Sequence, residues 1–272
     1  MVIFAISVLS LAALCWGFWR FSIRGRVGHP GLEQLRGWSY CHRGLHGNGI
    51  PENSMAAFRG AVDNGYGSEL DVHLLADGNL AVIHDSDLRR TTGREGFVED
   101  LTTGDLKNYP LEGTDQTIPT FREVLELFQG KAPLIIELKV HKNNVAALCD
   151  AACRMMEGYD GLWCMESFDP RCLLWLKKHR PEIIRGQLSE DYLHNPKIKQ
   201  PWILKFLLTH NMGNFLTKPD FIAYRYRDRC CTPSNRLCMK RMTGVSWTLQ
   251  TPEEYATATG EGWIPIFENF KP

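Results

Sequence analysis

The sequence has no net excess of charge of either sign. Its 31 Lys and Arg residues balance 31 Asp and Glu residues. The balance is uneven along the chain, because residues 171–241 contain 15 basic and 5 acidic residues. That stretch lacks a recognisable nucleic-acid motif and an interleaved aromatic platform, so we exclude nucleic acid as a partner. Two interpretations remain: solvated helix faces, or a basic surface that faces the phosphate groups of a membrane or a substrate.

Motifs for nucleotide and metal–thiolate chemistry are also missing. No strand-like segment is followed by G-x-G-x-x-G or by a Walker A sequence, which argues against a nucleotide-binding fold. The nine cysteines include no C-x-x-C pair, and several lie within apolar segments. We therefore expect small buried thiols rather than zinc ligands or disulfides. Many free thiols are typical of a reducing compartment.

Charge is absent from the first 19 residues, a length that matches the ~20 residues needed to cross a bilayer as a helix. A cleaved signal peptide fits less well, since no basic residue precedes the run and no small-x-small site follows it. Arg20, Arg24 and Arg26 come next, and the positive-inside rule then places the rest of the chain in the cytoplasm. The sequence predicts a transmembrane anchor at 1–19, a basic juxtamembrane linker at 20–37 and one domain at 38–272, in a single-pass protein of the cell membrane.

Strand-like and helix-like segments alternate along this domain. Residues 120–128, for example, place four apolar side chains on one helical face after a Pro-Thr start signal. Such alternation is typical of an α/β fold whose parallel strands are joined by helical crossovers. We predict a TIM (β/α)8 barrel preceded by one N-terminal transmembrane helix, with a doubly wound open sheet as the alternative. The strand candidates, one more than a barrel needs, are 38–41, 68–75, 80–85, 133–140, 161–168, 182–189, 220–226, 244–249 and 263–267.

Titratable side chains gather where the first four of these strands end. Four consecutive strands that each carry such groups are hard to explain by chance placement at a surface. In a TIM barrel the active site is built at the carboxyl ends of the strands, so we expect these residues to meet there. On the second and fourth strands they share one face, since side chains two residues apart point the same way. The residues are His42 and Arg43 on the first strand, Glu69 and Asp71 on the second, His84 on the third, and Glu137 with Lys139 on the fourth.

The types of these residues suit phosphate ester cleavage. Three carboxylates, Glu69, Asp71 and Glu137, form an all-oxygen ligand set that favours one divalent cation, Mg²⁺ or Ca²⁺, over zinc. The imidazoles of His42 and His84 can exchange protons near neutral pH. Arg43 and Lys139 supply positive charge for a phosphate group.

The same residues belong to a longer pattern: "HRG", "PENSMAAF", "ELDVHLLADGNLAVIHDSDLRRTTG", "IPTFREVLE" and "IIELK", continuing to "SWTL" and "GWIPIFENFKP". This pattern resembles the glycerophosphodiester phosphodiesterase family over almost everything after residue 37. The resemblance implies a TIM barrel that hydrolyses glycerophosphodiesters to glycerol 3-phosphate and an alcohol with the help of a metal. It implies His42 and His84 as catalytic acid and base, Glu69, Asp71 and Glu137 as metal ligands, and Arg43, Asn53 and Lys139 as support for phosphate or ligands.

Several residues depart from the pattern or allow a second interpretation. Ser54 stands where Thr is common in the family, and "IPIFENF" replaces a more aliphatic strand end, which affects the expected pocket wall. Asn53 could be only a helix cap. We expect His46 to be a solvated turn residue, and His73 to support the site from behind.

The substrate and the catalytic competence of the barrel allow alternatives. Besides soluble glycerophosphodiesters, a lysophospholipid is a candidate substrate, which would make the chain a lysophospholipase D. A phospholipase-C-like activity and a catalytically silent, membrane-anchored binding barrel are further alternatives. The apolar segment at 201–216 fits a crossover helix packed on the barrel, or a lip that rests on the bilayer beside several lysines.

Overall fold

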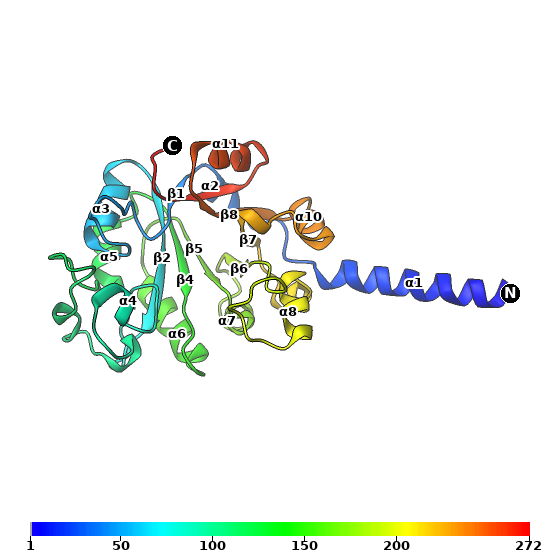
Figure 1. Ribbon diagram of the computed structural model, residues 1–272, viewed down its shortest axis with the longest axis horizontal. Coiled ribbons are helices and arrows are strands. Elements are labelled where there is room, and N and C mark those ends of the chain that lie inside the picture. Colours follow the sequence, from blue (N-terminus) through cyan, green and yellow to red (C-terminus); the bar gives the residue numbers. More distant parts are fainter. Residues whose placement is uncertain (1) are drawn as a thin grey trace.

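Eight parallel strands close into a barrel in the computed structural model, which describes residues 2–272 except for the side chains of residues 2, 3 and 5. The strand order is β1-β9-β8-β7-β6-β5-β4-β2, and β1 pairs with β2 to close the ring. Helices surround this ring (Figure 1). The predicted TIM barrel is therefore confirmed, and the doubly wound open sheet is wrong. The strands are β1 (Tyr40–Cys41), β2 (Gly67–Leu74), β3 (Leu80–Val82), β4 (Leu134–Leu138), β5 (Trp163–Ser167), β6 (Arg185–Ser189), β7 (Phe221–Arg225), β8 (Thr243–Leu249) and β9 (Ile264–Phe267).

The extra predicted strand, at 80–85, lies outside the ring. β3 pairs antiparallel with β2, with Val82 opposite Val72, and the two strands form a hairpin. Its turn is tight because the amide of Leu75 donates to the carbonyl of Asn79, and Gly78 takes a left-handed conformation (φ 82°). The hairpin explains why the sequence contains one strand more than a barrel needs.

The helices begin with the side-chain caps that their sequences suggest. Thr120 accepts a hydrogen bond from the amide of Glu123, and Glu123 bonds back to Thr120, forming a capping box at α5. Asp169 and Thr251 cap two further helices, each with Pro at the first position. The helices are α1 (Val2–Ser22), α2 (Leu32–Arg36), α3 (Met55–Asp63), α4 (Arg89–Thr92), α5 (Phe121–Phe128), α6 (Val145–Met156), α7 (Pro170–His179), α8 (Trp202–Thr209), α9 (Asn214–Thr217), α10 (Pro233–Met239) and α11 (Pro252–Gly260), with short 3-10 turns at Val98–Asp100, Leu106–Asn108 and Tyr226–Asp228.

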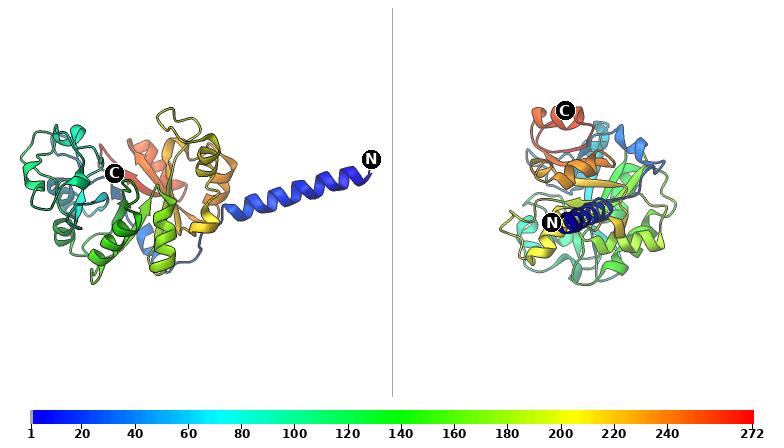
Figure 2. Two further views of the ribbon diagram at one scale, coloured as in Figure 1. Left: turned by 90° about the horizontal axis from the view of Figure 1, so that it is seen from below. Right: turned by 90° about the vertical axis from the view of Figure 1, so that its right-hand side faces the viewer.

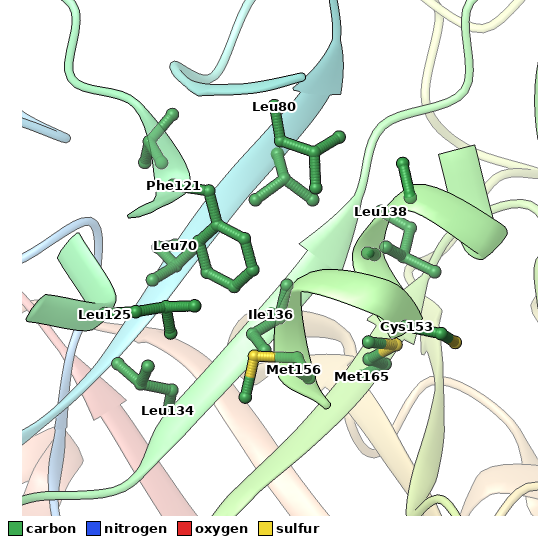
Figure 3. Packing of buried hydrophobic residues seen from close by; sticks show 14 of the residues in the cluster. Leu70, Leu80, Phe121, Leu125, Leu134, Ile136, Leu138, Cys153, Met156 and Met165 are labelled. Atoms are coloured by element: carbon green, nitrogen blue, oxygen red, sulfur yellow. The ribbon is translucent and has the colours of Figure 1, made fainter. Parts of the chain in front are cut away.

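The hydrophobic core has two layers on either side of the barrel wall. Outward-facing Leu70 and Ile136 pack against Phe121 of α5 and Met156 of α6 (Figure 3). The inward layer fills the barrel with side chains that include Ile135. The four predicted apolar residues of α5 are all buried, which holds the first half of the barrel rigid below the site.

Cysteine side chains pack within these layers as free thiols. The six that are buried are Cys41, Cys149, Cys153, Cys164, Cys172 and Cys238, whereas Cys230 and Cys231 are exposed. The expectation of small buried thiols is thus confirmed for most of them.

Helix α1 projects away from the barrel (Figure 1 and the left-hand view of Figure 2). Among the described residues, no helix is both long enough and apolar enough to cross a membrane, so the structure does not supply the transmembrane helix predicted at 1–19. Met1 and the side chains of residues 2, 3 and 5 in that range lie outside the described part. The predicted linker at 20–37 contains α2, and Arg26 forms two hydrogen bonds of 2.5 and 2.6 Å to Asp220 at the start of β7.

Candidate active site

Three buried carboxylates meet at the carboxyl end of the barrel. Glu69 and Asp71 point inward from β2, and Glu137 lies beside Asp71 on the neighbouring strand β4. One oxygen from each residue lies within 4.8 Å of the others, and the residues are 0–6% exposed. The predicted metal ligands are therefore brought together. Three like charges this close and this buried are unfavourable without a cation or protons to compensate them.

The pKa values of these groups reflect that conflict. Burial raises the pKa of Glu69 well above its usual range, and the charges of Asp71 and Glu137 raise it further. Burial also raises the pKa of Glu137 to about 7. Burial alone would raise the pKa of Asp71, but the Lys139 ammonium, together with Arg43 and the hydrogen bond from Asn53, holds that pKa well below its usual value. Without a cation, protons would have to compensate part of the charge.

An all-oxygen set of this kind fits a hard divalent cation such as Mg²⁺ or Ca²⁺. Lys139 Nζ lies 3.0 Å from Asp71 Oδ1 and 2.8 Å from Glu137 Oε1, so the ammonium completes the charge balance on one side of the cluster. Arg43 Nε lies 3.4 Å from Asp71 Oδ2. Arg43 also bonds to Glu52 at 3.0 Å, which fixes the guanidinium at the rim of the cluster. Both cations lie against the carboxylates and keep 14–15% of their side chains exposed.

Asn53 lies in the site rather than at a helix cap. The cap of α3 is Ser54, whose hydroxyl accepts a hydrogen bond from the amide of Ala57. Asn53 is 1% exposed, and its amide donates to Asp71 Oδ2 at 2.8 Å. The interpretation of Asn53 as a cap is therefore wrong. Its left-handed backbone (φ 52°) turns the side chain toward the carboxylates one residue before the helix begins.

His42 is held by a residue that the sequence did not indicate. Its Nδ1 lies 2.6 Å from Glu268 Oε2, and its Nε2 lies 4.0 Å from Glu69 Oε2. Glu268 follows β9, and its second oxygen accepts a hydrogen bond of 2.9 Å from Gln250. The contact with His42, with that of His46, outweighs burial and lowers the pKa of Glu268, so the carboxylate stays charged. A carboxylate at Nδ1 leaves Nε2 as the ring nitrogen that faces the metal ligands.

His84 reaches the site by a route that differs from the predicted one. The sequence placed it at the end of a parallel strand, but β3 is antiparallel and returns the chain toward Asp71, where the amide of Ile83 donates to the Asp71 carbonyl. His84 Nδ1 lies 2.6 Å from Asp85 Oδ1. Burial lowers the pKa of His84 to about 4. Both candidate histidines thus have a carboxylate on Nδ1.

Other polar residues behind the site were missed or misjudged. His46 is half-buried, with Nε2 3.6 Å from Glu268 Oε2, instead of being a solvated turn residue. His73 lies between Glu99 Oε1 (2.6 Å) and the carbonyl of His84 (3.2 Å), so it supports the site as expected. Glu99 comes from the loop after the hairpin, and no sequence signal pointed to it.

Glu166 is a further buried carboxyl that the sequence analysis passed over. It faces Glu137 in the β4–β5 register and is 1% exposed. Burial, followed by the charges of Glu137 and Asp71, raises its pKa well above the usual range. The signal was present in the strand-like segment "MESF", where a carboxyl interrupts an apolar pattern.

Comparison with known proteins agrees with this arrangement. The model of the glycerophosphoryl diester phosphodiesterase family matches residues 42–267. A glycerophosphodiester phosphodiesterase of Bacillus altitudinis is 36% identical over 169 residues, which are 58% of this chain and 68% of that relative. A lysophospholipase D of Rattus norvegicus is 39% identical over 115 residues, 38% of this chain and 36% of that protein.

A solved structure supports the fold. A phosphodiesterase of Oleispira antarctica, in complex with the product sn-glycerol-3-phosphate, matches with a TM-score of 0.70 at 21% identity, covering 85% of this chain and 92% of that one. The family match includes every residue of the described carboxylate and histidine cluster except Glu268, which directly follows it. The chain therefore belongs to the glycerophosphoryl diester phosphodiesterase family and is an enzyme of that class.

Proposed function

We propose that this chain hydrolyses glycerophosphodiesters to glycerol 3-phosphate and an alcohol, with one divalent cation, Mg²⁺ or Ca²⁺, and with His42 and His84 as general acid and base. The observation that carries the proposal is the buried cluster of Glu69, Asp71 and Glu137 beside His42. A structural salt-bridge network would not require three carboxylates to converge within 4.8 Å.

The residues of the cluster divide the work of binding. Glu69, Asp71 and Glu137 would hold the cation, which when bound supplies charge neutralisation for the phosphodiester. Asn53 orients Asp71 through its 2.8 Å hydrogen bond. Arg43 and Lys139 contact the phosphate oxygens and keep the diester against the histidines.

The two imidazoles handle the protons. Burial lowers the pKa of both His42 and His84, so each ring is neutral near pH 7 and can accept a proton. One removes the proton of the nucleophile. The other takes up a proton from solvent when the anionic diester binds beside it, and gives that proton to the leaving alkoxide. The nucleophile is either the neighbouring glycerol hydroxyl, giving a cyclic phosphate, or a water molecule. A diester without that hydroxyl separates the two routes, because unchanged turnover on it eliminates the cyclic one.

A second candidate substrate is a lysophospholipid. Relatives from rat, mouse and man that share 37–39% identity over 115 residues are named lysophospholipase D. Either substrate presents the same glycerol phosphate to the cluster and is cleaved at the same bond, between the phosphate and the headgroup alcohol. The two substrates differ in the acyl chain that must be accommodated.

We also propose that α1 holds the enzyme at the cell membrane, with the barrel on the cytoplasmic side. Support comes from the apolar side chains of α1, of which Phe4, Leu9 and Leu14 are 69–76% exposed, and from the arginines that follow it. Fractionation of cells that express the tagged full chain tests the location, with protease access to the barrel from each side as the test of orientation.

Product analysis of the full chain tests the proposed reaction. Glycerol 3-phosphate and free choline are measured in parallel from glycerophosphocholine, and lysophosphatidic acid and choline from lysophosphatidylcholine. Glycerol 3-phosphate from the first substrate supports the proposal. Turnover of the lysolipid alone shifts the assignment to lysophospholipase D. Monoacylglycerol and phosphocholine from the lysolipid would indicate phospholipase-C-like cleavage, and no turnover with any divalent cation would indicate a binding barrel.

A further inference from the structure

Helix α8 buries almost none of its apolar residues. Six of its first seven residues are apolar, yet Thr209 at its end is the one buried residue. Trp202 and Ile203 are 67% and 57% exposed, and the Trp202 ring stacks on Phe206. By contrast, α5 buries four of its eight residues against the barrel. The interpretation of this segment as an ordinary packed crossover helix is therefore wrong.

The exposed residues of α8 continue into those of its neighbours. Leu204 and Leu207 of α8, Leu174 of α7, Leu216 of α9 and Phe18 of α1 line one cavity of about 380 Å³. We call the apolar residues Leu174, Trp202, Ile203, Leu204, Leu207 and Leu216 the α8–α9 surface. A contiguous apolar area of this kind on a soluble domain is typical of a surface that binds a partner or a membrane.

Charge along the segment from 192 to 219, which contains α8 and α9, has one sign. The sequence contains no Asp or Glu from 192 to 219, whereas Lys197, Lys199, Lys205 and Lys218 lie in this range. Within the described part of the chain none of the four forms an ion pair: Lys205 reaches the carbonyl of Asn195, and Lys218 lies over the Phe21 ring. The ammonium groups of Lys197 and Lys199, which are exposed, can meet anionic groups outside the chain.

The surface also adjoins α1. The Phe21 and Phe215 rings are 5.2 Å apart, and Trp19 donates a hydrogen bond of 2.9 Å to Ser234 of α10. Two views show α1 leaving the barrel on this side (Figures 1 and 2). Apolar side chains nearly 200 positions apart in sequence thus form one area, which Phe18 connects.

We propose that the α8–α9 surface docks on an anionic lipid bilayer, with Trp202 and Ile203 among the acyl chains and Lys197 and Lys199 at the lipid phosphates. Apolar residues flanked only by cations match an anionic bilayer in chemistry. A second copy of the chain fits less well, because a twofold contact on this surface would bring like-charged lysines together.

Docking has a consequence for the active site. The segment that leads into α8 leaves the barrel after Ser189, at the carboxyl end of β6, which is the end that carries the carboxylate cluster. A bilayer on the α8–α9 surface therefore lies beside the mouth of the site, where diesters with acyl chains would be presented.

An environment-sensitive fluorescent amino acid at Ile203 of the full chain tests the proposal without requiring activity. The matched control carries it at Glu126, an exposed position on α5 at the far side of the barrel. The probe is added to vesicles of phosphatidylcholine with or without phosphatidylserine and with brominated acyl chains as quenchers. We expect a blue shift and quenching at 203 with phosphatidylserine, and neither at 126. For each lysine replaced, the double variant Lys197→Glu/Lys199→Glu should require about fivefold more anionic lipid to reach the same blue shift.

Water-like emission at 203 with the chain bound to vesicles would overturn the proposal, as would an equal response at 126 or an unchanged response in the lysine variant. Trp202→Ser/Ile203→Ser provides a second readout. It should leave turnover of water-soluble glycerophosphocholine unchanged and lower turnover of vesicle-embedded lysophosphatidylcholine. Equal turnover of the embedded lipid by variant and native chain would also contradict the proposal, whereas absence of all turnover bears only on the proposed reaction.

Discussion

Replacing Glu268 by Gln tests whether His42 is held in one tautomer. The Glu268 carboxylate accepts a hydrogen bond from Nδ1–H of His42 at 2.6 Å, so Nε2 carries the lone pair that faces Glu69. Gln250 donates to the other oxygen of Glu268 at 2.9 Å. In the variant Glu268→Gln, this donor would hold the carbonyl oxygen of the new amide. The amide NH₂ would then face Nδ1 and favour the opposite tautomer, with Nε2 protonated.

The size of the effect separates two explanations. Loss of a charge-assisted hydrogen bond alone corresponds to about 1.5–3 kcal/mol, or roughly 10- to 100-fold in rate. A reversed tautomer removes the base at Nε2, and in a comparable histidine–carboxylate pair it lowers kcat by about 10⁴-fold. Because Gln250 is placed to fix the unfavourable orientation, we expect kcat to fall by about 10³- to 10⁴-fold.

Steady-state release of glycerol 3-phosphate measures kcat and KM, and calorimetric titration with Mg²⁺ or Ca²⁺ checks that metal affinity is retained. Glu268→Asp keeps the charge and should lose less activity than Glu268→Gln. The double variant Glu268→Gln/Gln250→Glu supplies a carboxylate for the amide NH₂ and turns the carbonyl back toward His42, so it should recover part of the lost kcat. A loss of 100-fold or less for Glu268→Gln, or no recovery in the double variant, would refute this account of His42.

Three further changes test other parts of the site. Because the folded pKa of Glu137 is raised to about 7, its ionisation opposes folding as pH rises from the unfolded pKa near 4.5 through 7. In EDTA at pH 8, the free energy of unfolding of Glu137→Gln, measured by denaturant titration, should therefore exceed that of the native chain by up to about 3 kcal/mol, with little gain at pH 4. Addition of a divalent cation should restore stability to the native chain. Asn53→Ala should lower kcat/KM and metal affinity, and its stability should change little beyond the loss of the hydrogen bond to Asp71. Ser54→Ala should instead lower stability by about 1 kcal/mol, because it removes the cap of α3, and should leave kcat nearly unchanged. Equal kinetics for the two variants would contradict these separate roles. Arg43→Lys should raise KM for the diester about 10-fold or more, since a lysine cannot bridge Glu52 and a phosphate with a planar fork, and an unchanged KM would remove Arg43 from the phosphate site.

Local patterns predicted the residues that share a strand. Glu69 and Asp71 are two apart on β2, and Glu137 lies on a neighbouring parallel strand, so strand geometry alone brings them together. The extra strand was recognised by its length and apolar pattern. Its antiparallel direction, which returns His84 toward Asp71, depends on a five-residue turn whose geometry the apolar pattern does not encode.

Contacts between distant segments could not be predicted in this way. Glu268 lies 226 residues from His42 in sequence, and closure of the barrel between β1 and β9 makes them neighbours. Glu99 reaches His73 from the 3-10 turn at Val98–Asp100, which is too short to give a periodic signal. The exposure of Trp202 likewise depends on where α8 lies relative to the barrel, because the sequence pattern of an apolar helix is the same whether the helix is packed or exposed.

The most direct test of the proposed reaction is metal-dependent release of glycerol 3-phosphate from glycerophosphocholine by the full chain. The enzyme is stripped with EDTA and then supplied with Mg²⁺ or Ca²⁺, beside His42→Ala and Glu69→Gln. The account predicts release that EDTA abolishes, that one of the two cations restores in the native chain, and that neither restores in the variants. Equal release in EDTA, or full activity of His42→Ala with the cation present, would contradict it.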